Sequence, residues 1–204
     1  MSALHDELPP VYLFPKSYAD RVQRLRVAFG FVLLAAFAWL ADPSQSSMLI
    51  GLPISVIGLL LRAWSAGHLA KNQQLAATGP YAYIRNPLYV GTLIVAVGIV
   101  AASRNLWLAV IFAAVFFLVY LPAIELEEQH LRNIFPAYAG YANRVYRFVP
   151  IAKWTGGETR FSWALYRRNQ EYKALLGFLI AVVWLAWKCW RAAALPESGG
   201  APML

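Results

Sequence analysis

The sequence predicts an all-α, polytopic integral membrane protein. Three observations carry this prediction: the composition, five long apolar windows, and a one-sided distribution of basic residues. Of the 204 residues, 60% are hydrophobic and only 14% are charged. The mean hydropathy is +0.50, and the eight Trp and eleven Tyr residues are of the type that gathers at membrane interfaces. A soluble domain of this size would carry more charge, so the composition argues against that class.

Five windows between charged residues have the length and apolar character of membrane helices. They cover residues 27–41, 48–61, 88–103, 106–124 and 174–187. The fourth window lies within a run of 20 uncharged residues between Arg104 and Glu125. At ~1.5 Å per residue such a run covers the ~30 Å hydrocarbon core. The first and last windows are shorter, so their flanking Lys, Arg and Trp side chains must reach the interface. We therefore expect about five transmembrane helices.

The basic residues indicate how these helices are oriented. With five spans, 15 of the 18 Lys and Arg residues fall on the face that carries the N-terminus. Short basic loops stay in the cytoplasm, so we expect a multi-pass protein of the cell membrane with a cytoplasmic N-terminus and an outside C-terminus. The net charge of +8 then reflects topology and attraction to membrane lipids, and nucleic-acid binding is not needed to explain it. No obligate protein partner is evident.

The chain divides into three regions. Residues 1–61 hold the N-terminal cytoplasmic segment and two spans, residues 62–150 form the expected catalytic core, and residues 151–204 hold a linker, the fifth span and a disordered tail. The polar chemistry is confined to two segments of the core, at 62–86 and 125–150. Both lie on the same expected face, so they can meet at one site.

The first polar segment is a loop interrupted by prolines. Thr78-Gly79-Pro80-Tyr81 is a turn signal, because Gly permits positive φ and Pro fixes its own φ. Asn86-Pro87 then starts the third span, with Pro87 in its first turn. The N-terminus of this helix directs backbone N–H groups and positive potential toward the loop, and Arg85 adds a charge. The loop therefore suits an anionic group such as a carboxylate.

The second polar segment begins with three carboxylates at the end of the fourth span. On a helix Glu125 and Glu128 lie near one face while Glu127 points elsewhere, and Glu128 could also pair with Arg132 at i, i+4. The aromatic residues that follow could pack at the interface or form a wall for a cation; they are Phe135, Tyr138 and Tyr141. Together the two segments suit a zwitterion that carries a nearby cation, which is the character of the amino-acid part of S-adenosylmethionine.

These motifs match a known pattern. The loop GPYAYIRNPLYVG, followed one span later by Glu127-Glu128 and a Tyr138-x-x-Tyr141 pair, resembles the isoprenylcysteine carboxyl methyltransferase and phospholipid methyltransferase families of membrane enzymes. The resemblance covers about residues 62–150 and implies S-adenosyl-L-methionine as cofactor, with no metal. Carried over by position, it implies cofactor contacts at Gln73, Gln74, Leu75, Ala76, Gly79, Tyr81, Asn86, Pro87, Leu88, Tyr89, Glu127 and Glu128.

Three residues depart from the family pattern. Asn86 replaces the His of an Arg-His-Pro motif, which keeps hydrogen bonding but loses a titratable ring. Pro136 replaces a Gly and affects the shape of its loop. Ala123 occupies the position where prenylcysteine-type enzymes carry a substrate-binding Arg, so it weighs against a carboxylate acceptor.

The resemblance implies methyl transfer to a lipophilic acceptor that enters from the bilayer, such as a lipid amine, an isoprenoid or a prenylcysteine-like group. Catalysis of this reaction depends on positioning and desolvation, and an acceptor that must lose a proton also needs a base. Glu125 is the favoured base, because burial at the end of a span raises the pKa of a carboxyl group. His68 and His130 are alternatives, and Arg85 supplies a fixed positive charge near the reacting groups.

Two other functions fit parts of the pattern. An NADPH-dependent membrane reductase of the sterol-reductase type has a similar C-terminal organisation, but its cofactor phosphates would need more Arg and Lys in the pocket than carboxylates. The Glu127-Glu128 pair argues against it. A non-enzymatic membrane adaptor would keep the scaffold and bind no nucleoside cofactor.

Overall fold

The computed structural model describes residues 13–151, 153 and 159–194, and this part of the chain contains helices and no strands. Four helices are long and apolar enough to cross a membrane: α1 (Lys16–Leu40), α2 (Gln45–Ala66), the continuous helix Leu106–Ile134, and α8 (Tyr172–Ala194). The third predicted span, α3 (Pro87–Ser103), is a shorter apolar helix of 17 residues. The all-α, polytopic class is confirmed. The tail that we expected to be disordered lies largely beyond residue 194, outside the described residues.

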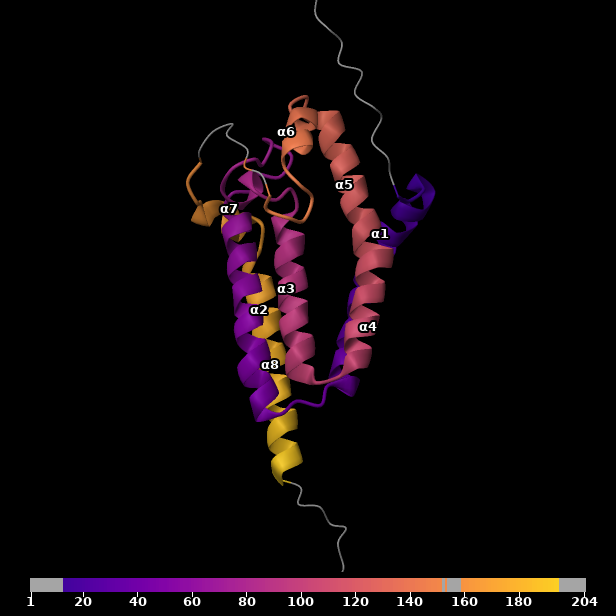
Figure 1. The fold of residues 1–204 in the computed structure, drawn as a ribbon, viewed down its shortest axis with the longest axis vertical. Coiled ribbons are helices and arrows are strands. Elements are labelled where there is room, and N and C mark those ends of the chain that lie inside the picture. Colours follow the sequence, from indigo (N-terminus) through magenta and orange to yellow (C-terminus); the bar gives the residue numbers. More distant parts are fainter. Residues whose placement is uncertain (1–12, 152, 154–158, 195–204) are drawn as a thin grey trace, which may run out of the picture.

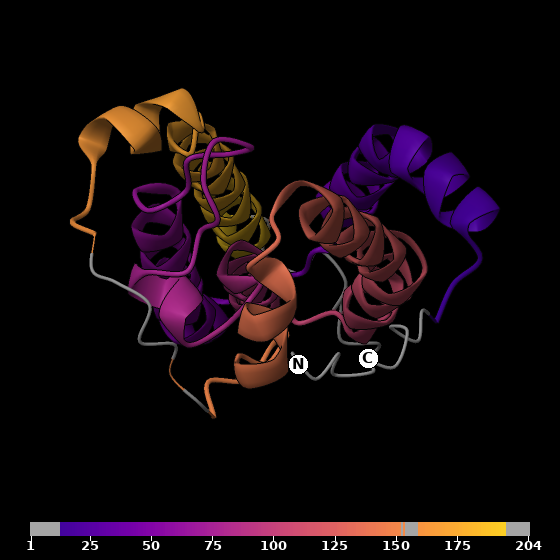
Figure 2. The ribbon, with the colours of Figure 1, turned by 90° about the horizontal axis from the view of Figure 1, so that it is seen from above.

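The long helices form two groups (Figures 1 and 2). α2 packs along α3, with α8 beside α2. α1 lies against the continuous helix Leu106–Ile134. One end of the molecule carries the loop at residues 67–86, α6 (Tyr138–Arg144) and α7 (Trp163–Arg168) (Figure 1). The opposite end carries the connection from α1 to α2 and the connection from α3 to the helix Leu106–Ile134. The two polar segments therefore lie at the same end of the bundle.

Glycines let α2 and α3 approach closely. A Cβ atom at Gly58 would lie 2.6 Å from the carbonyl oxygen of Gly91, and one at Gly91 would lie 2.8 Å from that of Gly58. Gly51 and Gly98 form a second such pair further along the helices. In lipid, helices gain little from the hydrophobic effect, so small residues that allow close van der Waals contact stabilise their association. This packing fixes α3, whose first turn carries part of the site.

The fourth span is one helix with an irregular middle. α4 (Leu106–Val115) passes through a π-helical turn, η2 (Phe116–Tyr120), into α5 (Leu121–Ile134). Pro122 has no N–H to offer the carbonyl of Leu118 four residues earlier, and the hydroxyl of Tyr18 donates to that carbonyl at 2.8 Å. This hydrogen bond links the fourth span to α1. The helix ends at Ile134, ten residues past residue 124, where the predicted window ends.

Lys188 joins α8 to α1 at the other end of the bundle. Its Nζ atom donates to the carbonyl oxygens of Ala38, Trp39 and Ala41, at 3.3, 3.1 and 2.5 Å. The last carbonyls of a helix have no partners within the helix and carry negative potential. A lysine from α8 thus caps the C-terminus of α1.

Candidate active site

A cavity of about 400 Å³ lies among α1, the loop at 67–86, the start of α3, α5 and α6. It is lined by ten of the residues that the sequence predicted for the site: Gln74, Leu75, Ala76, Tyr81, Arg85, Asn86, Pro87, Leu88, Tyr89 and Glu127. Gln73, Gly79, Glu125 and Glu128 are not among its lining residues. The two polar segments therefore do meet, as their common face predicted.

The loop takes its shape from a glycine turn. Gly79 has φ +59° and opens the 3₁₀ turn η1 (Gly79–Ala82), and a Cβ atom there would lie 2.6 Å from the ring of His68. A larger residue would be strained in this conformation and would also clash. The turn buries Tyr81, and the hydroxyl of Tyr141 on α6 donates to the carbonyl of Tyr81 at 2.7 Å. Gly79 thus shapes the loop without lining the cavity.

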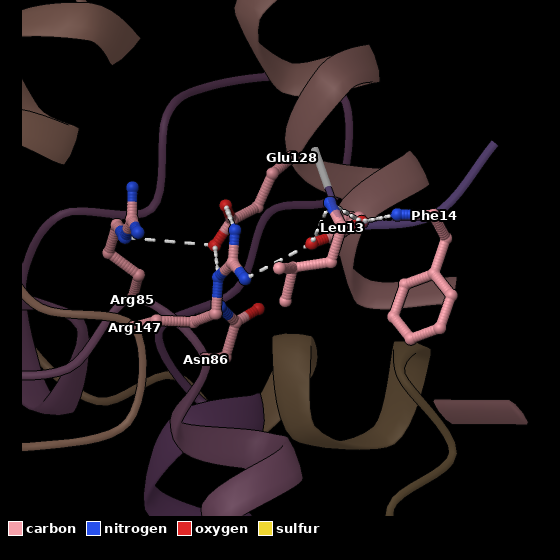
Figure 3. Close-up of polar contacts among 7 residues, drawn as sticks. Leu13, Phe14, Arg85, Asn86, Glu128 and Arg147 are labelled. Carbon is pink, nitrogen blue, oxygen red and sulfur yellow. Dashed lines mark hydrogen bonds and ion pairs between the residues drawn. The ribbon is translucent and has the colours of Figure 1, made fainter. Parts of the chain in front are cut away.

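Glu128 is the centre of a buried charged network that joins the two segments (Figure 3). Its side chain accepts from Nδ2 of Asn86 at 2.9 Å, and from Nη2 and Nε of Arg147 at 2.8 and 3.2 Å. The Nε atom of Arg85 lies 3.6 Å from the same carboxylate. Burial works against the charge of Arg147, but the hydrogen bond and the charge of Glu128 outweigh it and raise the pKa of the guanidinium. Glu128 therefore connects the loop, α5 and the segment after α6.

Backbone hydrogen bonds reinforce this junction. The N–H of Arg85 donates to the carbonyl of Tyr146 at 3.0 Å, and the N–H of Asn86 donates to that of Arg147 at 3.3 Å. Asn86 thus uses both its backbone and its side chain to hold α5 and the segment after α6. Arg147 had no role in the predicted site, because no local motif marks it.

Glu125 does not line the cavity. It is 2% exposed, and its carboxylate accepts from the backbone N–H of Leu13 at 3.2 Å and of Phe14 at 3.3 Å (Figure 3). Nη1 of Arg147 lies 3.5 Å from one of its oxygens. The carboxylate expected to act as a base is therefore engaged in fastening the segment before α1 to α5.

Glu127, in contrast, lines the cavity. Its carboxylate accepts from the hydroxyl of Tyr89 at 3.2 Å. Of the alternative bases, His130 also lines the cavity, whereas His68 is buried beside the loop with Nδ1 2.9 Å from the carbonyl of Trp64. Arg132, the possible partner of Glu128, instead lies over the ring of Tyr138, 5.5 Å from its centroid. The helical spacing predicted this separation of the glutamates correctly.

Several lining residues were not singled out from the sequence. They are Asp20, Gln23 and Arg26 of α1, Leu69, Lys71 and Asn72 of the loop, and Leu126 and Leu131 of α5. Tyr138, Tyr141, His130 and Ala123, which the sequence did point to, line the cavity as well. The three residues of α1 are spaced by three and so share a helix face. This spacing could have indicated a polar face on α1, but it does not indicate that the face lines a cavity.

A second cavity of about 650 Å³ adjoins the first. Its walls are mostly apolar and include Val27, Phe31 and Leu34 of α1 and Thr92 of α3. The two cavities share six lining residues: Arg26, Leu69, Lys71, Leu88, Tyr89 and Glu127. Val27, Phe31 and Leu34 are themselves largely exposed on a helix that can cross the membrane. The second cavity therefore leads from the polar end of the bundle toward the lipid-facing side of α1.

The junction of the two cavities carries both signs of charge. Arg26 and Lys71 line both cavities, and neither forms an ion pair within the described part of the chain. Glu127 and Tyr89, whose hydroxyl donates to Glu127, line both cavities as well. Such a site can hold an anionic group and a cationic group together, with the aromatic ring as an additional surface for the cation.

Comparison with known proteins adds an independent finding. Residues 25–138 match the family model described as phospholipid methyltransferase. The chain is 29% identical to the cobalt-zinc-cadmium resistance protein CzcN of Cupriavidus metallidurans, over 72% of this chain and 70% of the relative. It is 31% identical to the nickel-cobalt-cadmium resistance protein NccN of Alcaligenes xylosoxydans xylosoxydans, over 64% of each chain.

A third relative comes from a eukaryote. Over 51% of this chain and 55% of the relative, the sequence is 30% identical to phosphatidylethanolamine N-methyltransferase B of Dictyostelium discoideum. No solved structure matches the chain. The family match spans most of α1 through the start of α6, so it includes both cavities' principal walls.

Proposed function

This chain belongs to the phospholipid methyltransferase family, and from that membership we propose that it transfers a methyl group from S-adenosylmethionine to a lipophilic acceptor held in the membrane. One observation carries the proposal: a polar cavity with aromatic and charged walls adjoins a mostly apolar cavity beside α1, and six residues line both. The first suits a zwitterionic cofactor and the second suits a lipid chain. A reaction between them would take place at the junction.

The residues of the first cavity fit the cofactor. The positive potential at the N-terminus of α3, with Arg85 and Lys71, favours a carboxylate, while Tyr81, Tyr89 and Glu127 favour the ammonium and sulfonium charges. When bound, S-adenosylmethionine supplies a methyl group activated by positive sulfur. The protein's part is to hold the two reactants in line and to exclude water, which is where most of the acceleration arises in such transfers.

The acceptor that fits best is a lipid amine with an anionic group nearby. Arg26 and Lys71 are placed to bind the anion, while Glu127 at the same junction favours an ammonium. An amine must lose a proton before it can attack, and His130 and Glu127 are the acid–base groups that line the cavity among the candidates. The name of the Dictyostelium relative supports an amine acceptor. Because Ala123 lines the cavity without a charge, it does not favour a carboxylate acceptor.

The orientation follows from the charges. The end with the cavity carries most of the basic residues, so we place it at the cytoplasmic face of the cell membrane, with the C-terminus outside. The acceptor would then enter sideways from the bilayer along α1. A nicotinamide-dependent reductase and a non-enzymatic adaptor are the alternatives that an experiment should separate.

Calorimetry in detergent with S-adenosylhomocysteine tests the cofactor. We expect the wild type to bind it, and Glu127→Ala and Tyr81→Ala to weaken binding by roughly tenfold or more, about 1.4 kcal/mol. Asn133→Ala is the matched control, because Asn133 is exposed on α5 and does not line the cavity. Binding of NADPH in place of S-adenosylhomocysteine would overturn the proposal in favour of a reductase. Failure to bind either compound would favour an adaptor.

A further inference from the structure

The chain returns to the site after α6, beyond the residues matched by the family. The side-chain amide of Asn169 donates to the carbonyl oxygens of Ala66 and Leu69, at 2.9 and 2.8 Å. The N–H of Ser162 donates to the carbonyl of Gly67 at 2.9 Å. These carbonyls belong to the end of α2 and the turn after it, where a helix leaves acceptors without partners. A distant segment thus holds the point at which α2 becomes the loop.

A second layer of contacts comes from packing. The ring of Phe161 covers Gly67 so closely that any Cβ atom there would clash with it. Phe161 also contacts His68 edge-on, with ring centroids 6.2 Å apart, and His68 in turn lies against Gly79. The hydroxyl of Thr159 is hydrogen-bonded to that of Thr78, the residue before Gly79. The contacts of Phe161 with His68, and of His68 with Gly79, therefore connect the returning segment to the turn that positions Tyr81.

Glu171, at the end of the same segment, reaches the wall of the second cavity. Its two oxygens accept from Nε and Nη2 of Arg62, the latter at 3.0 Å, and it is 8% exposed. The guanidinium of Arg62 also donates to the hydroxyl of Thr92 and, at 3.4 Å, to the carbonyl of Leu88. Without Glu171 the partly buried guanidinium of Arg62 would lose its carboxylate partner, which is unfavourable.

The residues that this segment contacts belong to the walls of the two cavities or lie next to them. Leu69 and Leu88 line both cavities, Arg62 lines the second, and the loop from Lys71 onward lines the first. The helix α8 that follows is attached through Lys188 at its far end, and Leu185 is its only buried residue among those described for that helix. We propose that residues 159–171, the return clamp, position the walls of the cofactor and acceptor cavities, with Asn169 and Glu171 as positioning residues. The catalytic part of this inference rests on the proposed function.

The test uses Asn169→Leu, which keeps the size of the side chain but removes the donor. Asn133→Leu is the matched control, since Asn133 is exposed and makes none of these contacts. We expect faster backbone hydrogen exchange confined to residues 66–77, together with a roughly tenfold higher Kd for S-adenosylhomocysteine. The KM for S-adenosylmethionine should rise in step, while kcat at saturation changes little. A general loss of structure would instead accelerate exchange throughout the bundle.

The outcomes separate the clamp from the proposed function. Unchanged exchange at 66–77 and unchanged affinity in Asn169→Leu would overturn the clamp while leaving the methyltransferase intact. Faster local exchange in a protein whose wild type binds no S-adenosylhomocysteine would support the clamp and overturn the function.

If Asn169→Leu does not fold, Glu171→Gln replaces it. Exchange should then rise at residues 62–69 and 88–92, and the double variant Arg62→Met/Glu171→Met should reverse the rise by removing both charges. No reversal would overturn the role of Glu171.

Discussion

Three neighbouring carboxylates have three different surroundings. Glu128 is 4% exposed and shared among Asn86, Arg85 and Arg147, Glu125 accepts backbone N–H groups from the segment before α1, and Glu127 faces the cavity. Helical spacing predicts that Glu127 separates from the other two. It could not predict Arg147, because pairing with a residue about twenty positions away depends on the path of the chain after α6. Nor could it predict that the segment before α1 folds back onto Glu125.

Glu125→Gln distinguishes a structural carboxylate from a base. The neutral amide accepts more weakly from Leu13, Phe14 and Arg147, so we expect unfolding in detergent to become easier by about 1–3 kcal/mol. The kcat of the folded variant should fall by far less than the ~10²–10⁴-fold that a general base contributes. Thermal unfolding and initial methyl-transfer rates measure the two effects. A rate loss of that size with unchanged stability would restore Glu125 as the base.

At the scale of the elements, the apolar windows located the helices but not their ends. α1 begins at Lys16 and the fourth span continues to Ile134, both well into polar sequence. Hydropathy reports which residues suit lipid, whereas backbone hydrogen bonding carries a helix through polar turns as well. The close contact of α2 and α3 also escaped prediction, although Gly51, Gly58, Gly91 and Gly98 supply it. Glycines in two separate windows do not by themselves indicate that they face each other.

Gly58→Ala tests the helix contact. Alanine usually favours a helix over glycine by up to ~1 kcal/mol, but here its methyl group would meet the carbonyl of Gly91 at 2.6 Å. We expect overpacking to prevail and to lower stability by about 1–3 kcal/mol, seen as a lower thermal midpoint in detergent. Gly177→Ala is the control, because a Cβ atom there meets nothing within 4 Å. Equal midpoints for the two variants would contradict the close packing of α2 and α3.

At the scale of the whole molecule, the site lies where the two helix groups meet at their polar end (Figure 2). The loop and the first turn of α3 come from one group, and α1 and α5 come from the other. The alternation of the spans predicted that the two polar segments share an end, and the motif predicted ten of the residues that line the first cavity. The second cavity could not be foreseen, because its wall on α1 carries no motif and arises only from how the groups diverge.

This arrangement explains why a membrane scaffold serves the proposed reaction. The polar cavity stays at the water-facing end, where a charged cofactor can enter, and the apolar cavity follows α1 toward lipid. Arg26, Lys71 and Glu127 stand at the meeting point of the two. An acceptor would need no transfer through water, because its chain can remain in apolar surroundings while its headgroup reaches the junction.

The most direct measurement is transfer of a labelled methyl group from S-adenosylmethionine to vesicles made from a total lipid extract. We predict that the purified wild type labels a lipid amine in the organic phase, and that Glu127→Ala reduces the labelling at least tenfold while Asn133→Ala does not. Label that remains in the aqueous phase, or equal labelling by Glu127→Ala and the wild type, would contradict a site at the junction of the two cavities.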